Sequence, residues 1–230
     1  GWYAYDLPSL DDIPALERRP AVTLLARDGT AFARFGEAAS RPVTVAELPP
    51  HVPRAVIAVE DARFYDHFGI DVIGLARAMV ANIMAGRIRQ GGSTITQQLA
   101  KNLFFGPERT LKRKVQEMIM ALWLERRFTK DQILALYLNR VYLGAGNFGI
   151  EAAAKSYFGK SGRKLLLNEA AMLAGLLKAP SRYAPTRHRD RAARRAAVVL
   201  GRMAATGFIT QAQANVVKLN PARLGRQQAR

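Results

Sequence analysis

The stretch GGSTITQQLAKN, residues 91–102, contains the clearest helix start of the chain. Its two glycines interrupt the preceding apolar run, and Thr94 followed three residues later by Gln97 forms a capping-box pattern that predicts a helix reaching about Phe105. A helix start presents free backbone N–H groups and the positive end of the helix dipole, which favours an anion. Lys101 lies two turns further along on nearly the same face. The stretch therefore predicts either an anion site or an ordinary capped helix.

Helical periodicity extends outward from this stretch on both sides and predicts a mainly α chain. Residues 1–50 are irregular and rich in proline, and there Val22 to Ala26 and Ala31 to Phe35 flank Asp28-Gly29, which predicts a β-hairpin. Further helices are expected over 56–63, 70–88, 129–139 capped by Thr129, 150–157, 169–178 capped by Asn168, and 191–206 closed by Gly207. Another helix is expected to carry the stripe Val115, Met118, Ile119 and Leu122, which would face the core.

Composition narrows the possible partners without choosing one. The 230 residues include 35 Lys and Arg against 18 Asp and Glu, a net charge of +17, which favours nucleic acid, anionic lipid or a phosphorylated substrate. The absence of Cys excludes disulfides and thiol chemistry. No stretch reaches the roughly 18–20 consecutive apolar residues of a membrane helix, and we expect an N-terminal anchor to be absent from this chain.

One motif match and the three histidines have an ordinary structural explanation. Residues 144–149 read GAGNFG and match the dinucleotide-binding fingerprint, but they follow a helical pattern rather than a strand. We therefore expect a loop between two helices. The three histidines lack metal-ligand spacing, and His67 is expected to pack or to form a hydrogen bond.

Two carboxylates stand in contrasting surroundings. Glu60 follows the apolar run 55–59, where burial would raise its pKa toward that of a general base. Glu117 follows the cations Arg109, Lys112, Arg113 and Lys114, which would keep it ionised and suit a diphosphate. The alternatives are surface acids for the first and a solvated helix with an Arg113–Glu117 pair for the second.

Five motifs in this order resemble the family-51 glycosyltransferases, which occur in bifunctional class A penicillin-binding proteins and in monofunctional peptidoglycan polymerases. The matching positions are Glu60-Asp61-x-x-Phe64-x-x-His67-x-Gly69, Gly91 to Gln98 with Lys101-Asn102, Arg113-Lys114-x-x-Glu117, Ile133-Leu134-x-x-Tyr137-Leu138-Asn139, and Gly149-Ile150-x-x-Ala153-Ala154-x-x-Tyr157-Phe158-Gly159-Lys160. The likeness covers nearly the whole chain, and residues 1–50 favour a fragment of a bifunctional synthase.

This resemblance implies a lysozyme-like helical head lobe with a smaller, membrane-proximal jaw lobe. The expected division is an irregular segment and hairpin at 1–50, packed on a glycosyltransferase domain at 51–230 whose jaw lobe spans about 70–92. The implied reaction polymerises lipid II into β-1,4-linked glycan, with inversion at the donor anomeric carbon and release of undecaprenyl diphosphate. The implied place is the periplasmic face of the cytoplasmic membrane.

The resemblance also implies roles for individual residues. Glu60 would be the general base, and Glu117 would orient the site or help to hold a divalent cation such as Mg²⁺. The donor and its diphosphate would be bound by Ser93, Thr94, Gln97, Gln98, Lys101, Asn102, Arg109, Arg113 and Lys114. Supporting positions would be Asp61, Phe64, His67 and Asn139. Implied partners are lipid II, the lipid-linked glycan chain, an anionic membrane surface, phosphoglycolipid inhibitors such as moenomycin, and a cell-wall synthesis complex.

Two rival functions remain at this point. A lysozyme-like hydrolase or lytic transglycosylase also depends on a catalytic Glu, but it leaves the basic cluster around Lys114 without a role. A nucleic-acid-binding module would use the net charge, with its best patch at Arg182, Arg187, Arg189, Arg191, Arg194, Arg195 and Arg202. We expect that patch to be a solvated helix face or a surface facing anionic lipid, and we expect no nucleic-acid partner.

Overall fold

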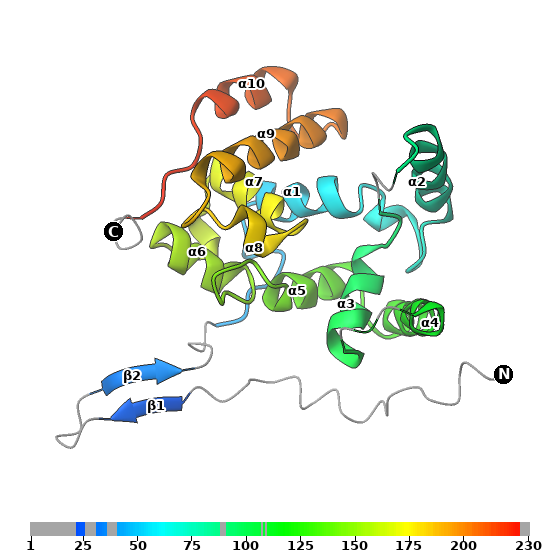
Figure 1. Cartoon of the computed structure of the whole chain (residues 1–230), viewed down its shortest axis with the longest axis horizontal. Coiled ribbons are helices and arrows are strands. Elements are labelled where there is room, and N and C mark those ends of the chain that lie inside the picture. The colour runs from blue at the N-terminus through cyan, green and yellow to red at the C-terminus, as the bar shows by residue number, and fades with distance from the viewer. Residues whose placement is uncertain are drawn as a thin grey trace.

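The computed structural model describes residues 22–25, 31–35, 41–87, 91–106, 108 and 110–225. Its elements follow one another along the chain in Figure 1. They are β1 (Val22–Leu25), β2 (Ala31–Phe35), α1 (His51–Glu60), a 3-10 turn at Phe64–Asp66, α2 (Val72–Met84), α3 (Ile95–Phe104), α4 (Leu111–Arg127), α5 (Lys130–Arg140), α6 (Ile150–Phe158), a 3-10 turn at Gly162–Lys164, α7 (Leu167–Leu176), α8 (Pro180–Tyr183), α9 (Arg189–Ala205) and α10 (Gln211–Leu219). The prediction of a mainly α fold is confirmed.

The core lies around α7, which contacts both α1 and α9. Every residue of α7 from Glu169 to Leu176 is buried. On α1 the run Ala55 to Ala58 is buried, and on α9 the side chains of Val199, Leu200 and Met203 face the same core. Burial of several Leu, Val and Met side chains at about 1.5–3 kcal/mol each stabilises this arrangement. Since α1 ends in this core, its last residue, Glu60, is held on a rigid support.

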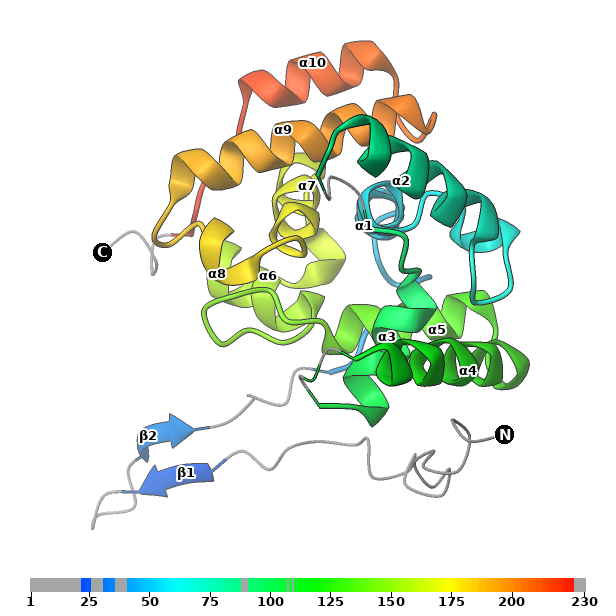
Figure 2. The same cartoon turned by 45° about the vertical axis from the view of Figure 1, so that its right-hand side comes forward.

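A second group of helices carries the 91–102 stretch. α3 contacts α4 and α5, and Ile95, Leu99 and Ala100 are fully buried between them. Figure 2 shows α3 lying between α1 and α4. The start of α3 therefore connects the end of α1 with the basic part of α4.

The loop between α5 and α6 contains the GAGNFG sequence, and the prediction of a loop is confirmed. Its Gly149 has φ +82°, and a Cβ at that position would lie 2.5 Å from the carbonyl oxygen of Asn139. Only glycine fits that position. Gly149 of this sequence thus allows the loop backbone to pack closely against the backbone of Asn139.

Two helix predictions were wrong in detail. The stripe of Val115, Met118, Ile119 and Leu122 is only half-buried or exposed, while the buried face of α4 carries Gln116, Glu117, Met120, Ala121, Leu124 and Glu125. This face is mixed because polar partners from α3 and α5 meet it. The helix predicted to be capped by Asn168 begins at Leu167, where the Glu169 carboxylate accepts the backbone N–H of Leu166.

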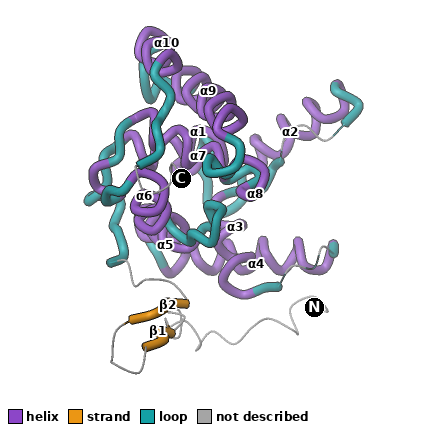
Figure 3. Tube along the Cα trace, turned by 60° about the vertical axis from the view of Figure 1, so that its left-hand side comes forward, coloured by secondary structure: helices purple, strands orange, loops and turns teal. Residues whose placement is uncertain are grey.

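The α2 helix projects from the helical body on the same side as α4 (Figure 3). Only Ala78 is buried on it. Its apolar side chains are exposed, among them Val72 at 70%, Ile73 at 58%, Met79 at 58%, Val80 at 56%, Ile83 at 73% and Met84 at 84%. The exposure of these side chains shows that α2 is not a core helix. Among the described residues, no helix has the length and apolar character needed to cross a membrane.

The predicted hairpin is present as an antiparallel pair of β1 and β2. Val22 pairs with Phe35 and Leu24 with Ala33, and the register shifts between Leu24 and Leu25. The predicted turn at Asp28-Gly29 lies outside the described residues. Packing of the hairpin on the helical body stays a prediction, but residues 41–48 do join that body, because Val43 and Leu48 are buried in the core.

Candidate active site

Glu60 is the last residue of α1 and follows its buried run 55–58. The side chain is half-buried. Burial is the largest influence on its carboxyl and raises its pKa above the ordinary value of 4.5, because the charged form loses hydration. This direction agrees with the sequence-based prediction that burial raises the pKa of Glu60. Such a group can accept a proton at a pH near its own pKa.

Charges on α9, on α3 and on the residue after α1 adjust this pKa. Arg195 on α9 and Lys101 on α3 lower it, whereas neighbouring Asp61 raises it. Arg195 belonged to the basic patch of the nucleic-acid rival, yet it is half-buried and its charge acts on Glu60. Its Nε is buried without a hydrogen-bond partner among the residues that the structure describes. Arg195 is thus a site residue that the sequence analysis placed elsewhere.

The carboxylate of Glu60 is held by one amide. Gln98 Nε2 on α3 donates to Glu60 Oε2 at 2.9 Å. The oxygen of the same amide, Gln98 Oε1, accepts from the hydroxyl of Tyr137 on α5 at 3.0 Å. Gln98 was predicted to bind substrate, and the structure places its side chain beside the proposed base. Tyr137 stood in a quoted motif but had no predicted role.

Asp61 connects three segments next to Glu60. It is 7% exposed. Its Oδ2 accepts the backbone N–H of Ile95 at 3.0 Å, and His67 Nε2 lies 2.9 Å from its Oδ1. Phe64, fully buried, stacks edge-on to the His67 ring. The predicted supporting positions 61, 64 and 67 therefore form one brace between the end of α1 and the start of α3.

The helix start at Thr94 is an ordinary cap. Its hydroxyl accepts the N–H of Gln97 at 3.1 Å and donates to the carbonyl of Gly69 at 2.6 Å. With Ile95 N–H bonded to Asp61, two of the N–H groups expected to face an anion are already used. The predicted capped helix is confirmed, and the anion site stays a prediction.

Glu117 forms the second carboxylate centre. It is 7% exposed on α4, and its Oε2 lies 2.9 Å from Lys114 Nζ. The same Nζ donates to Ser93 Oγ at 2.8 Å. Lys114 keeps 41% of its side chain exposed. Ser93 and Gln98 lie five residues apart, so one short segment contacts both the Glu60 and the Glu117 centres.

The other predicted substrate-binding residues differ in position. Lys101 and Asn102 are exposed on α3, and Gln97 is buried. Arg113 stacks over the Phe105 ring at 4.6 Å, and its Nη1 donates to the carbonyl of Gly106 at 2.8 Å, so it braces the loop before α4. Arg109 lies outside the described residues.

Asn139 serves the fold at a different place. Its Oδ1 accepts the N–H of Val43 at 2.9 Å, and its Nδ2 donates to the carbonyls of Val43 and Ala135, each at 2.7 Å. It therefore anchors the segment before α1 to α5. The described contacts of Asn139 give it a structural function only.

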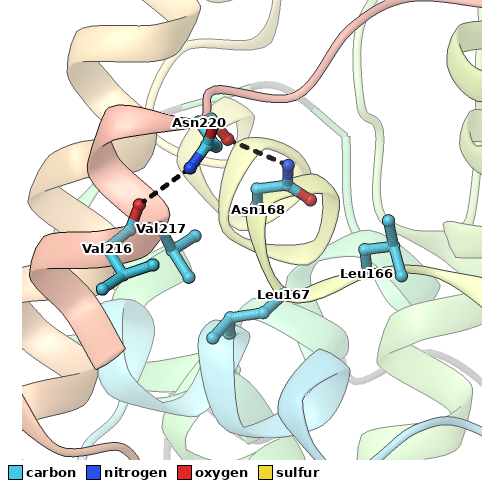
Figure 4. A pocket seen from close by; sticks show the side chains of 6 residues that line it. All are labelled: Leu166, Leu167, Asn168, Val216, Val217 and Asn220. Atoms are coloured by element: carbon cyan, nitrogen blue, oxygen red, sulfur yellow. Dashed lines mark hydrogen bonds between the residues drawn. The ribbon is translucent and has the colours of Figure 1, made fainter. Parts of the chain in front are cut away.

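Among the described residues, neither a group of metal ligands nor the pocket below adds to this site. In the described ranges, no group of three His, Asp or Glu side chains could hold a metal ion. Glu117 supplies one carboxylate, and that carboxylate already faces an ammonium. A pocket of about 210 Å³ lies between α7 and α10 (Figure 4), lined by Leu166, Leu167, Asn168, Val216, Val217 and Asn220. It contains none of the predicted site residues.

The chain is similar in sequence to known proteins. A sequence model described as Transglycosylase matches residues 28–204. The chain is 47% identical to penicillin-binding protein 1A of Escherichia coli over 216 residues, 93% of this chain and 25% of that protein. It is 53% identical to penicillin-binding protein 1A of Aquifex aeolicus over 171 residues, 74% of this chain and 24% of that protein.

A solved structure agrees with these sequence relatives. The crystal structure of penicillin-binding protein 1A from Haemophilus influenzae superimposes with a TM-score of 0.56 and 25% identity, covering 91% of this chain and 22% of that one. The chain thus spans about a quarter of the length of the curated relatives that it matches. From the matched motifs, the family model and this shared fold, we conclude that the chain belongs to the transglycosylase family, as a transglycosylase domain of the class A penicillin-binding-protein type.

Proposed function

We propose that this domain polymerises lipid II into β-1,4-linked glycan strands, with inversion at the donor anomeric carbon. The observation that carries the proposal is the Glu60 carboxyl, whose pKa is raised by burial and which is bound by Gln98, five residues after the Ser93 hydroxyl that contacts the Lys114 ammonium. A base and a diphosphate-binding cation are the two groups that this reaction needs.

The proposed step transfers one proton and exchanges one bond. The Glu60 carboxylate takes the proton of the acceptor's sugar 4-hydroxyl, and that oxygen forms a bond to the donor's anomeric carbon. The carbon–oxygen bond to the lipid diphosphate breaks from the opposite face, so the configuration inverts. Gln98 holds Glu60 Oε2, and we assign the acceptor hydroxyl to Oε1.

The leaving diphosphate gains negative charge, and cations offset it. Lys114 presents a partly exposed ammonium, and Lys101 is exposed on the neighbouring helix. Arg113 and Arg109 would complete this wall. Ser93 and Glu117 would aim the Lys114 ammonium through their contacts at 2.8 and 2.9 Å. A Mg²⁺ ion would find one protein carboxylate here, so no step of the proposal passes through a metal.

The exposed apolar face of α2 supports a membrane-proximal jaw lobe. Side chains such as Ile83 and Met84 would enter the boundary of a bilayer, which also contains the lipid tail of the substrate. Exposed arginines of α9, including Arg191 and Arg194, would suit anionic headgroups. We propose residues 51–230 as the glycosyltransferase domain, acting at the periplasmic face of the cytoplasmic membrane.

A polymerisation assay with Glu60→Gln tests the proposal. Wild-type domain incubated with lipid II should form polymer, whereas the variant should form none and still bind a non-reactive donor analogue. Asp190→Asn, which removes an exposed carboxylate on α9, serves as the matched control and should stay active. Cleavage of preformed glycan without polymer formation would support a lytic enzyme instead.

Folding can be checked with the same variant. Because the folded-state pKa of Glu60 is raised above 4.5, native Glu60 keeps its proton to a higher pH than unfolded Glu60. Stability is therefore lost as pH rises from about 4.5 to that raised pKa. Gln does not titrate, so Glu60→Gln should be at least as stable as wild type at pH 7. Inactivity of the variant then reports chemistry.

A further inference from the structure

Tyr137 is fully buried on α5, with 1% of its surface exposed, and its hydroxyl points to Gln98. The pKa of Tyr137 is raised well above its ordinary value by burial and by the charge of Glu60, so the phenol keeps its proton at neutral pH. Tyr137 is therefore a permanent hydrogen-bond donor. Its described acceptor is Gln98 Oε1, at 3.0 Å.

The amide of Gln98 can be oriented in two ways that occupy nearly the same space. In one, Nε2 faces Glu60, and in the other, Oε1 does. Only the first gives an ionised carboxylate a donor; the second sets two acceptors against each other. The Tyr137 hydroxyl donates a hydrogen bond to Oε1 and so stabilises the first orientation from the other end of the amide.

We propose that Tyr137 is a positioning residue of the glycosyl transfer: through Gln98, it keeps an N–H donor on Glu60 Oε2 and leaves Oε1 to the acceptor hydroxyl. This inference rests on the proposed role of Glu60 as the base. It gives Gln98 a part different from sugar binding, because both ends of its amide are occupied within the protein.

The hydrogen-bond chain from Tyr137 through Gln98 to Glu60, here called the relay, lies among charged groups that change the pKa of Glu60. The groups that act on Glu60 are Asp61 on its own chain segment, Gln98 and Lys101 on α3, and Arg195 on α9, with Tyr137 facing from α5. Donation from Gln98 lowers the pKa of Glu60 and opposes the effect of burial. When the amide is free to turn, that donation weakens and the pKa of Glu60 rises.

Tyr137→Phe removes the hydroxyl that donates to Gln98 Oε1 and keeps the ring that packs in the core. We expect the acid limb of the polymerisation rate to move to higher pH by up to about one unit, since one hydrogen bond to a charged group contributes on that order. Below the original limb the rate should fall by up to about tenfold, and at the high-pH plateau it should recover to within about twofold.

The chain offers a matched control in Tyr157. This residue is also fully buried, and its hydroxyl donates to the carbonyl of Leu143 at 2.9 Å, away from Glu60. Tyr157→Phe removes the same atom and one hydrogen bond. It should lower the melting temperature about as much as Tyr137→Phe and leave the pH profile in place.

A double variant separates the relay from simple packing. Gln98→Met removes the amide and should by itself move the acid limb upward. If Tyr137 acts through Gln98, adding Tyr137→Phe to Gln98→Met should produce no further movement. Glu60→Gln, measured in parallel, reports on the base itself.

The outcomes are distinct. A shifted limb in Tyr137→Phe that vanishes in the Gln98→Met background supports the relay. An unchanged profile, an equal slowing at every pH, or a shift that adds to that of Gln98→Met overturns the relay, provided that Glu60→Gln is inactive. A fully active Glu60→Gln overturns the proposed function itself, and the relay with it.

Discussion

Replacing Asp61 tests whether its buried carboxylate holds the end of α1 to the start of α3. The buried carboxylate accepts the N–H of Ile95 at 3.0 Å and contacts Nε2 of His67 at 2.9 Å. Asp61→Ala leaves both donors buried without an acceptor. Asp61→Asn keeps one oxygen for the N–H of Ile95 but removes the negative charge from that bond.

The magnitude follows from these contacts. A buried donor left unpaired costs about 1–3 kcal/mol, so two such donors destabilise Asp61→Ala by about 4 kcal/mol. Loss of charge assistance alone gives about 1–1.5 kcal/mol for Asp61→Asn. For a domain of this size, 1 kcal/mol changes the melting temperature by about 2–4 °C. We expect decreases of about 8–16 °C for Asp61→Ala and about 2–6 °C for Asp61→Asn.

Thermal unfolding followed by circular dichroism measures both changes. Asp66→Asn is the matched control, because Asp66 is exposed and lies five residues further along. A melting temperature for Asp61→Ala within 2 °C of this control, or equal to that of Asp61→Asn, would refute the role of Asp61 as a buried brace. Removing its charge should also lower the pKa of Glu60, since Asp61 raises it.

Two more predictions concern charge and membrane contact. Arg195→Gln should move the acid limb of the polymerisation rate to higher pH, because the Arg195 charge lowers the pKa of Glu60. The exposed neighbour Arg194→Gln makes the same change in net charge and should leave the limb in place, and equal shifts in the two variants would contradict a local effect. Ile83→Ser on α2 should weaken binding to anionic lipid vesicles by about tenfold without loss of thermal stability, since Ile83 is 73% exposed. The control Val216→Ser on α10, where Val216 is 62% exposed, should bind as the wild type does. Cosedimentation with vesicles measures the difference, and equal binding of all three proteins would show that α2 does not contact the membrane.

Local sequence signals predicted most of the helices, because caps and glycines act over a few residues. Thr129 with Gln132 forms the expected capping box at the start of α5, and Gly207 with φ +73° ends α9 as predicted. The buried face of α4 could not be predicted this way. Its Glu117 and Glu125 are buried because Lys114 and Lys130 meet them, and periodicity counts only apolar residues.

The site was predicted in the same uneven manner. The apolar approach to Glu60 was visible in the sequence, and so was the cationic neighbourhood of Glu117. The contact of Tyr137 with Gln98 could not be predicted, because a tyrosine in an apolar helix is typical of a core residue and the sequence does not show where its hydroxyl lies. Arg195 was read as one of many surface arginines, since seven of them share the 182–202 region.

The amino-acid sequence alone determined the helical class, the order of the helices and the family, because short-range capping, periodicity and motif spacing are written along the chain. Only the tertiary structure decided what each polar side chain does. It turned Gln98 toward Glu60, placed Asp61 at the start of α3 and left α2 exposed. Around Glu60, residues of α1, α3, α5 and α9 that are far apart in the sequence lie close together. Burial and charge act through space rather than along the chain, so these effects depend on the tertiary structure.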